Sequence, residues 1–192
     1  MHPRFKFFGF ATTTLLLSLT FWQLSFVLRR SPLTAQAQDV IATLPDGNYQ
    51  FCSQPETKES PFGAGVCFWF RKVNNRVVGD YGYPQSDDSI CVSGEIQGNL
   101  ATGEALAISW PGRVWENIPK SPFYWDEENR LQLHQASTIH TSGTKDERTD
   151  WIEFRNAALN LSGFYRYQTV GMGEDRIPKS CSVQSITETW KQ

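Results

Sequence analysis

The residues best suited to bind a ligand are four aromatic side chains in a segment interrupted by prolines. Trp110, Trp115, Tyr124 and Trp125 lie where Pro residues break any regular strand. Tyrosine and tryptophan combine a large apolar surface with a polar atom, and both are prominent in ligand-binding sites. The four residues are therefore the predicted ligand-binding platform. The alternative is a lid that closes the end of a β-barrel and buries the same rings in the core.

Three consecutive acidic residues follow this segment, at Asp126, Glu127 and Glu128. Two carboxyl groups could act as the general acid and the general base of glycoside hydrolysis. Neighbouring residues of a strand point to opposite faces, however, and these three residues border a loop. We therefore interpret them as a solvated loop and predict no catalytic residue. A glycan-acting hydrolase that uses Asp126–Glu128 is kept as an alternative.

Two histidines, His134 and His140, lie beyond the first 37 residues. Their spacing of six residues places both on one face of a strand. A zinc site needs further protein ligands, and the spacing of the other residues indicates no third one. The pair Asp87-Asp88 likewise lacks the alternating oxygen ligands of a calcium loop. No metal and no cofactor is therefore predicted.

The four cysteines are Cys52, Cys67, Cys91 and Cys181, and none of them belongs to a Cys-x-x-Cys pair. An even number of cysteines in an exported chain predicts disulfides and an oxidising compartment. In an up-and-down sheet, the end of the first strand lies beside the start of the second. Cys52 and Cys67 occupy these positions, and strand alternation places both side chains on the outer face. We therefore predict a Cys52–Cys67 disulfide, which leaves Cys91–Cys181 to fasten the C-terminal tail.

Alternating apolar and polar residues, separated by short turns that contain Asn or Gly, predict β-hairpins along most of the chain. The expected strands are 46–52, 67–73, 76–81, 90–96, 100–109 and one that starts at 131, followed by a last hairpin of 151–154 and 159–167. No segment shows a helical period. About eight strands in sequential hairpins predict an all-β fold, a small antiparallel up-and-down barrel stapled by disulfides.

Strand alternation also predicts which side chains fill the barrel, because successive residues point to opposite faces. The expected interior residues are mostly aromatic or β-branched: Tyr49, Phe51, Phe68, Phe70, Val77, Tyr81, Tyr83, Ile90, Val92 and Ile96. Gly79 and Gly94 occupy the same inward positions, where a glycine usually marks a sharp bend of the strand.

The first 37 residues have the features of a secretory signal peptide. Basic residues precede an apolar run over residues 7–28, and Ala35-x-Ala37 is a small-residue cleavage site. The apolar run is long, so an uncleaved N-terminal membrane anchor is the alternative. The expected divisions are 1–37 for the signal peptide, 38–170 for the β-barrel domain and 171–192 for a C-terminal tail.

Removal of the signal segment changes the charge of the protein. It takes away four of the 18 basic residues and none of the 20 acidic ones, which leaves a net charge of −6. Such an acidic chain lacks the excess of basic residues with which proteins bind the phosphates of nucleic acid. The expected location is extracytoplasmic, either periplasmic or secreted, and a membrane is a partner only if the N-terminal segment stays uncleaved.

The strand pattern is similar, in architecture only, to the calycin group of small barrels, which includes lipocalins and avidin. Gly47-Asn48-Tyr49 is the nearest counterpart of the Gly-x-Trp opening of lipocalins. The Thr-Ala-Gln-Ala-Gln sequence of residues 34–38 and the strands within 46–167 also resemble uncharacterised exported proteins of cyanobacteria. Neither resemblance rests on a catalytic motif, so neither implies an activity.

The expected function is that of a non-enzymatic exported β-barrel, which binds a small apolar or saccharide ligand or a protein partner. The alternatives are a glycan-acting hydrolase and a structural envelope protein. A cavity lined by aromatic side chains would favour the first function. Two facing carboxylates in a cleft would favour the second, and a filled barrel would favour the third.

Overall fold

The computed structural model of the chain describes residues 40–111, 115, 118–144, 147–171 and 177–189, and the predicted signal segment lies outside them. These residues contain nine strands: β1 (Gly47–Cys52), β2 (Cys67–Val73), β3 (Arg76–Gly82), β4 (Ser89–Gln97), β5 (Leu100–Ser109), β6 (Phe123–Tyr124), β7 (Leu131–Ser142), β8 (Thr149–Asn160) and β9 (Tyr165–Arg166). They also contain a short 3-10 helix, η1 (Ile41–Thr43), and an α-helix, α1 (Val183–Thr189).

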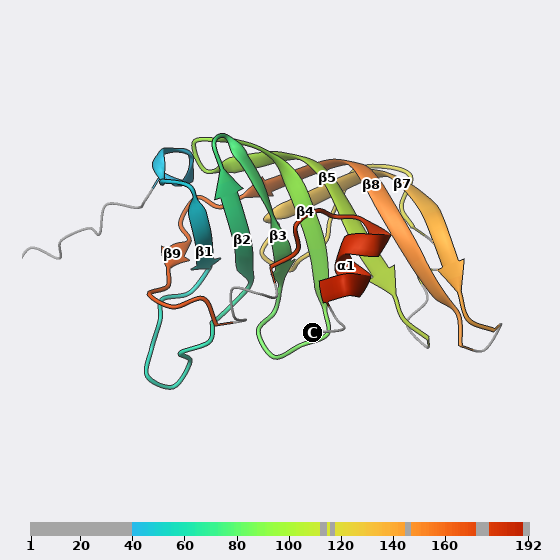
Figure 1. Cartoon of the computed structure of the whole chain (residues 1–192), viewed down its shortest axis with the longest axis horizontal. Coiled ribbons are helices and arrows are strands. Elements are labelled where there is room, and N and C mark those ends of the chain that lie inside the picture. Colours follow the sequence, from blue (N-terminus) through green and yellow to red (C-terminus); the bar gives the residue numbers. More distant parts are fainter. Residues whose placement is uncertain (1–39, 112–114, 116–117, 145–146, 172–176, 190–192) are drawn as a thin grey trace, which may run out of the picture. The chain divides into compact units, whose positions relative to one another are not determined.

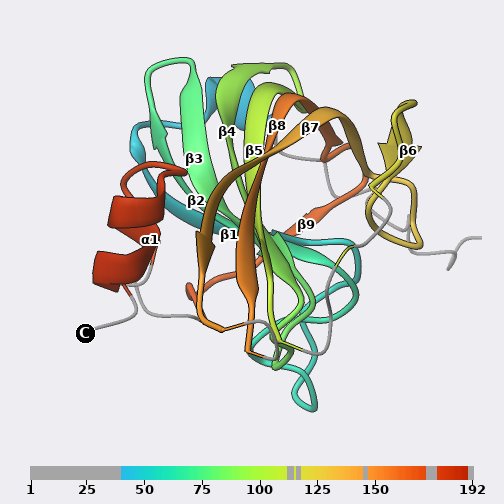
Figure 2. The same cartoon turned by 90° about the vertical axis from the view of Figure 1, so that its right-hand side faces the viewer.

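The nine strands form one antiparallel sheet in the order β6-β7-β8-β5-β4-β3-β2-β1-β9, and the sheet curls into a half-barrel (Figures 1 and 2). The prediction of an all-β, up-and-down architecture is confirmed. The first five strands pair in sequence order. After them, β8 returns between β5 and β7, and β9 then pairs with β1. The short connection from β8 to β9 therefore links two distant parts of the sheet order.

Side chains from the long strands fill the inside of the curl. The predicted interior residues are buried except Tyr83, which lies beyond β3 and is half-buried, and Phe68 stacks on Phe70 with their ring centroids 4.6 Å apart. Two buried residues from outside the strands, Ile41 and Leu161, join this core. The backbone N–H of Ile41 donates to the side-chain Oδ1 of Asn99 at 2.8 Å, and that of Leu161 donates to the backbone carbonyl of Asn99 at 2.8 Å. The β4–β5 turn thus holds both segments that cover this end of the core.

The predicted hairpin of 151–154 and 159–167 is wrong, because residues 149–160 form the single strand β8. Arg155 and Asn156 are both exposed, which interrupts the alternation of buried and exposed residues. The pairing of β5 with β8 shifts register at this point, between Gly103 and Ala105. The interruption is a β-bulge, in which an extra residue reverses the alternation without ending the strand.

Both predicted disulfides are present. Cys52 is bonded to Cys67, 15 residues away in sequence, and Cys91 is bonded to Cys181, 90 residues away. Two disulfides indicate an oxidising, extracytoplasmic environment. The second bond fastens the C-terminal segment to β4.

The C-terminal segment contains a helix that the sequence analysis missed. With seven residues, α1 is too short for a helical period to stand out. It begins after Ser182, whose Oγ accepts the N–H of Ser185, as in a helix N-cap. Ile186 packs with Leu106 and Trp151, and α1 lies across β4 and β5 in Figure 1. Residues 177–189 are therefore a packed part of the fold rather than a loose tail.

Candidate functional site

The four predicted aromatic residues have different surroundings. Trp115 packs on Phe154, with ring centroids 5.9 Å apart, and Trp125 packs on Tyr81, with centroids 5.7 Å apart. Both tryptophans are half-buried against the core, as the lid interpretation expects. Tyr124 is 50% exposed and Trp110 is 37% exposed. Of the four, these two present the most ring surface to solvent.

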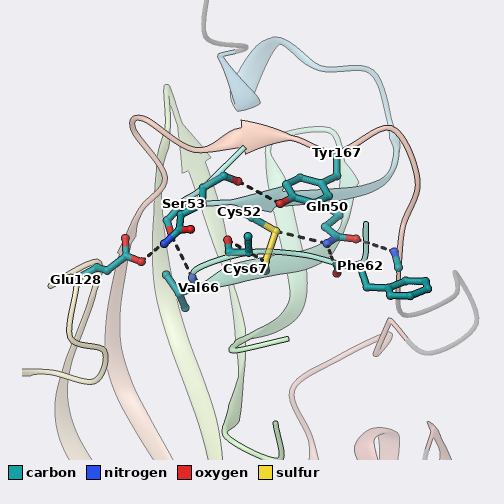
Figure 3. Close-up of a disulfide and its surroundings, with 11 residues drawn as sticks. Gln50, Cys52, Ser53, Phe62, Val66, Cys67, Glu128 and Tyr167 are labelled. Atoms are coloured by element: carbon teal, nitrogen blue, oxygen red, sulfur yellow. Dashed lines mark hydrogen bonds between the residues drawn. A yellow bond between two sulfur atoms is a disulfide. The ribbon is translucent and has the colours of Figure 1, made fainter. Parts of the chain in front are cut away.

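The acidic residues 126–128 are engaged in the turn between β6 and β7. Asp126 is 5% exposed, and its Oδ2 accepts the backbone N–H of Leu131 at 2.8 Å. Glu128 accepts the hydroxyl proton of Ser53 at 2.6 Å, which ties this turn to the end of β1 (Figure 3). Burial, followed by the charge of Asp126, raises the pKa of Tyr81 far above its usual value. The turn thus uses its carboxylates for structure and keeps the Tyr81 hydroxyl protonated.

The surroundings of the Cys52–Cys67 disulfide form a second buried polar network (Figure 3). Gln50 is fully buried, and its amide Nε2 donates to the carbonyl of Phe62 at 2.8 Å. Its Oε1 accepts the N–H of Gly171 at 2.6 Å. Both ends of the amide are satisfied, which is the condition for a polar group to be buried without a large cost. This network fastens loops to β1 and offers no free group to a ligand.

A groove on the outer face of the sheet is the candidate ligand-binding site. Its volume is about 730 Å³, and it is an open trough. Five neighbouring strands and one loop residue line it: Arg76 of β3, residues 93–95 of β4, 102–104 of β5, 155–158 of β8 and 132–134 of β7, with Pro122. Along β4, β5 and β8, outward residues under α1 are apolar, whereas those in the groove are mostly polar. The outer face is therefore divided into a covered apolar part and an open polar part.

Several features that commonly bend a sheet lie together at this groove. Gly94 and Gly103 lie opposite each other on β4 and β5, and the β8 bulge is next to them. On β7, Gln135 has a φ of 59°, the left-handed region that residues other than glycine seldom adopt. Bulges and glycines are the usual means by which a sheet is bent, and bulges are common beside functional sites. The floor of the groove is built from small residues, which leaves room above it.

Several polar side chains around the groove are free to meet a ligand. Arg76 lies opposite Glu95, yet the two make no ion pair in the described part of the chain. The amides of Gln132 and Asn156 are exposed and have no hydrogen-bond partner among the described residues. Tyr124 pairs with Gln132 across β6 and β7, so both side chains have the same parity and face outward at one side of the groove. The site thus combines hydrogen-bond donors, acceptors and one exposed aromatic ring.

The predicted histidines do not form a metal centre with other ligands. His134 lines the groove, and its Nε2 lies 3.2 Å from the carbonyl oxygen of Lys120. His140 is exposed further along β7. Within the described residues, no group of three or more His, Cys, Asp or Glu is placed to hold a metal ion. No helix in the same part of the chain is long and apolar enough to cross a membrane.

No protein-family model, no curated protein and no solved structure matches the chain. The protein is therefore defined by its architecture, a disulfide-linked all-β half-barrel with a polar groove on its outer face. The resemblances to calycins and to exported cyanobacterial proteins stay predictions.

Sequence reasoning identified Tyr124, at the border of the groove, and considered His134 only as a metal ligand; it missed the other residues that line the groove. The signals that could have indicated the groove are polar residues at outward positions of long strands and the broken alternation at Arg155 and Asn156. Each signal is weak alone, because an outward polar residue usually does no more than face water. Only the strand order brings residues 76 and 156 to one surface.

Proposed function

We propose that this protein is a non-enzymatic, exported binding protein that holds a saccharide in the outer groove. The observation that carries the proposal is the groove itself, about 730 Å³ in volume and lined by polar side chains, of which the amides of Gln132 and Asn156 have no hydrogen-bond partner among the described residues. Sugars present many hydroxyl groups, which amide, carboxylate and guanidinium groups recognise by hydrogen bonds. Tyr124 supplies an exposed ring on which a sugar can lie.

Other ligands of the expected class fit less well. A small apolar ligand needs an apolar cavity, and the inside of the half-barrel is filled by one cluster of buried side chains. A protein partner commonly adds a strand to an open sheet edge. β6 has two residues and pairs only with Gln132 and Leu133, so a strand from a protein partner would pair with the edge that residues 134–142 of β7 leave open among the described residues, rather than occupy the groove.

A hydrolase is the competing function, because Glu95 and Glu104 both line the groove. They are diagonal neighbours on adjacent strands, a placement that keeps their Cα atoms roughly 7–8 Å apart. Both side chains are exposed, whereas a general acid of this chemistry is shielded from solvent so that it stays protonated. We therefore place binding before hydrolysis.

The test is calorimetric titration of the mature protein with soluble saccharides, using glucose-, xylose- and N-acetylglucosamine-based oligomers as probes. The double variant Gln132→Ala/Asn156→Ala should weaken binding at least about tenfold, since two hydrogen-bonding groups are lost. The matched control is Gln54→Ala, an exposed amide in the β1–β2 loop, which should bind normally. Absence of binding to every probe contradicts the proposal, and steady release of reducing ends establishes the hydrolase instead.

Export also belongs to this proposal, with cleavage before Gln38. The two disulfides support it, because such bonds persist in oxidising compartments. N-terminal sequencing of protein from the periplasm or the medium should start at Gln38. Membrane-bound protein with an intact Met1 would show that the segment is an anchor.

A further inference from the structure

The groove is longer across the strands than along them. It extends from Arg76 on β3 to His134 on β7, with β4, β5 and β8 between these strands. Four strand spacings amount to roughly 19 Å, because hydrogen-bonded strands lie about 4.8 Å apart. Along β4, β5, β7 and β8 the lining covers only three or four residues, or roughly 10–13 Å, and β3 contributes Arg76 alone. A ligand that follows the long dimension must cross the strands.

The charges along the groove balance over short distances. Arg76 faces Glu95 on the next strand, at one side of the groove. Further along, the Nε of Arg155 lies 3.9 Å from a carboxylate oxygen of Glu153, and Glu104 lies opposite the bulge that contains Arg155. Each guanidinium therefore has carboxylates as neighbours, and the groove offers no excess of either sign. A ligand with a charge on every unit would meet repulsion as often as attraction.

The floor of the groove has no deep apolar pocket. Buried floor residues include Gly94 and Ala157, which have little or no side chain. Peptides gain specificity when alternate side chains enter separate pockets, and this floor provides none. A smooth polar trough instead suits a chain of similar, hydroxyl-rich units.

We propose that the groove binds the internal part of an extended, uncharged glycan chain that crosses the strands. This inference rests on the proposed function, because it specifies the form of the saccharide. About four sugar rings fit between Arg76 on β3 and Gln132 on β7, which are four strand spacings apart, since a hexose unit in an extended chain is close in length to one strand spacing; Tyr124 lies one strand further, on β6. Arg76 contacts one end of the bound stretch, and the ring of Tyr124 supports the other.

The experiment measures affinity as a function of chain length. Glucose-, xylose- and N-acetylglucosamine-based oligomers of one to six units are titrated into the mature protein. For the series that binds, affinity should rise at least about tenfold from two to four units and then level off. The third and fourth units add contacts with the groove, whereas further units extend beyond it and add none. Arg76→Ala and Tyr124→Ala should each weaken the four-unit ligand more than the two-unit ligand. Tyr165→Ala, which changes another exposed tyrosine, is the matched control and should alter neither.

The outcomes separate this inference from the proposed function. Equal affinity for one unit and for six would overturn the extended chain but leave a saccharide site in place. Tighter binding of a polyuronate of equal length would overturn the uncharged ligand. Binding of extended peptides with no response to any saccharide would overturn both proposals. Thermal melts of each variant must match the parent protein, so that lost binding is not lost folding.

Discussion

Gly94 on β4 and Gly103 on β5 face each other so closely that neither position can accept a side chain. A Cβ atom on Gly94 would lie 2.2 Å from the carbonyl oxygen of Thr102, and one on Gly103 would lie 2.2 Å from that of Ser93. Both contacts involve backbone atoms, which cannot turn aside as a flexible side chain can. The two strands approach and bend here because the glycines leave the space empty.

Gly103→Ala should therefore lower the free energy of unfolding by about 1–3 kcal/mol and distort the groove, because the two strands must move apart. Gly47→Ala is the matched control, since the nearest contact of its added Cβ would be 3.4 Å, ordinary packing. Urea unfolding of both variants tests this. A Gly103→Ala protein as stable as Gly47→Ala would show that the close approach has no structural role.

The half-buried tryptophans should contribute to stability more than the exposed ring of Tyr124. Trp115→Ala removes the contacts with Phe154 and Phe123, and Trp125→Ala removes those with Tyr81 and Tyr83. Each should cost roughly 3 kcal/mol, the lower end of the range for a buried aromatic ring, because both rings are partly exposed. Tyr124→Ala should change stability by less than about 0.5 kcal/mol. Denaturant melts that show no loss for either tryptophan variant would contradict the lid interpretation.

Asp80 should make the protein less stable as the pH rises toward neutrality. It lies between Trp69 and Cys91 on the outer face, and burial raises the pKa of its carboxyl group to about 7. Between about pH 4 and pH 7, the native state holds a proton that the unfolded chain has lost, so the free energy of unfolding falls across this range. Asp80→Asn should remove that fall and raise the melting temperature more at pH 8 than at pH 5.

The control for this experiment is Asp87→Asn, which changes an exposed carboxylate in the β3–β4 loop. Its effect on the melting temperature should be small and similar at both pH values. If Asp80→Asn behaves in the same way as Asp87→Asn, then the ionisation of Asp80 does not govern this part of the stability curve.

The two disulfides should differ in how readily they are reduced. Cys181 is partly exposed, whereas Cys52, Cys67 and Cys91 are buried. A thiolate reductant must reach a sulfur atom, so mild dithiothreitol should open the Cys91–Cys181 bond first. Alkylation followed by peptide mapping should label this pair while Cys52–Cys67 stays intact. Earlier labelling of Cys52 or Cys67 would contradict the observed burial.

Loss of the Cys91–Cys181 bond should also loosen α1. The bond joins residues 90 positions apart, and its removal should cost about 4–5 kcal/mol in the chain-entropy model. Faster hydrogen exchange over residues 183–189 is expected in Cys91→Ala/Cys181→Ala, because Ile186 then packs on the sheet without a covalent tie. The corresponding double variant at Cys52 and Cys67 should leave exchange in α1 unchanged.

Local sequence patterns were enough to predict the first five strands and both disulfides. Alternation and turn residues such as Asn74-Asn75 act over a few positions, and strand parity then places Cys52 beside Cys67. The position of β8 between β5 and β7 depends on pairing between distant residues, which no local pattern contains. The bulge at Arg155 and Asn156 interrupts the alternation just as the end of a strand would, which is why the sequence pattern predicts a hairpin where the structure has one long strand.

The groove was beyond prediction for the same physical reason. Its two sides come from Arg76 and Gln132, which are far apart in sequence and meet one surface only after the sheet has formed and bent. The aromatic residues near 110–125 cluster in sequence, so a local pattern predicts them as a binding platform. In the structure, Trp115 and Trp125 contribute mainly to packing, and the free polar groups lie elsewhere.

The most direct test of the account is to locate the bound saccharide by NMR. Amide ¹H–¹⁵N shifts of the mature protein are followed during titration with a four-unit neutral oligosaccharide that binds in calorimetry. The account predicts that the largest changes fall on residues 93–95, 102–104, 132–134 and 155–158, which line the groove. Changes concentrated instead at Trp110, Trp115 and Trp125, or inside the half-barrel at Phe68 and Tyr81, would contradict a ligand site on the outer face.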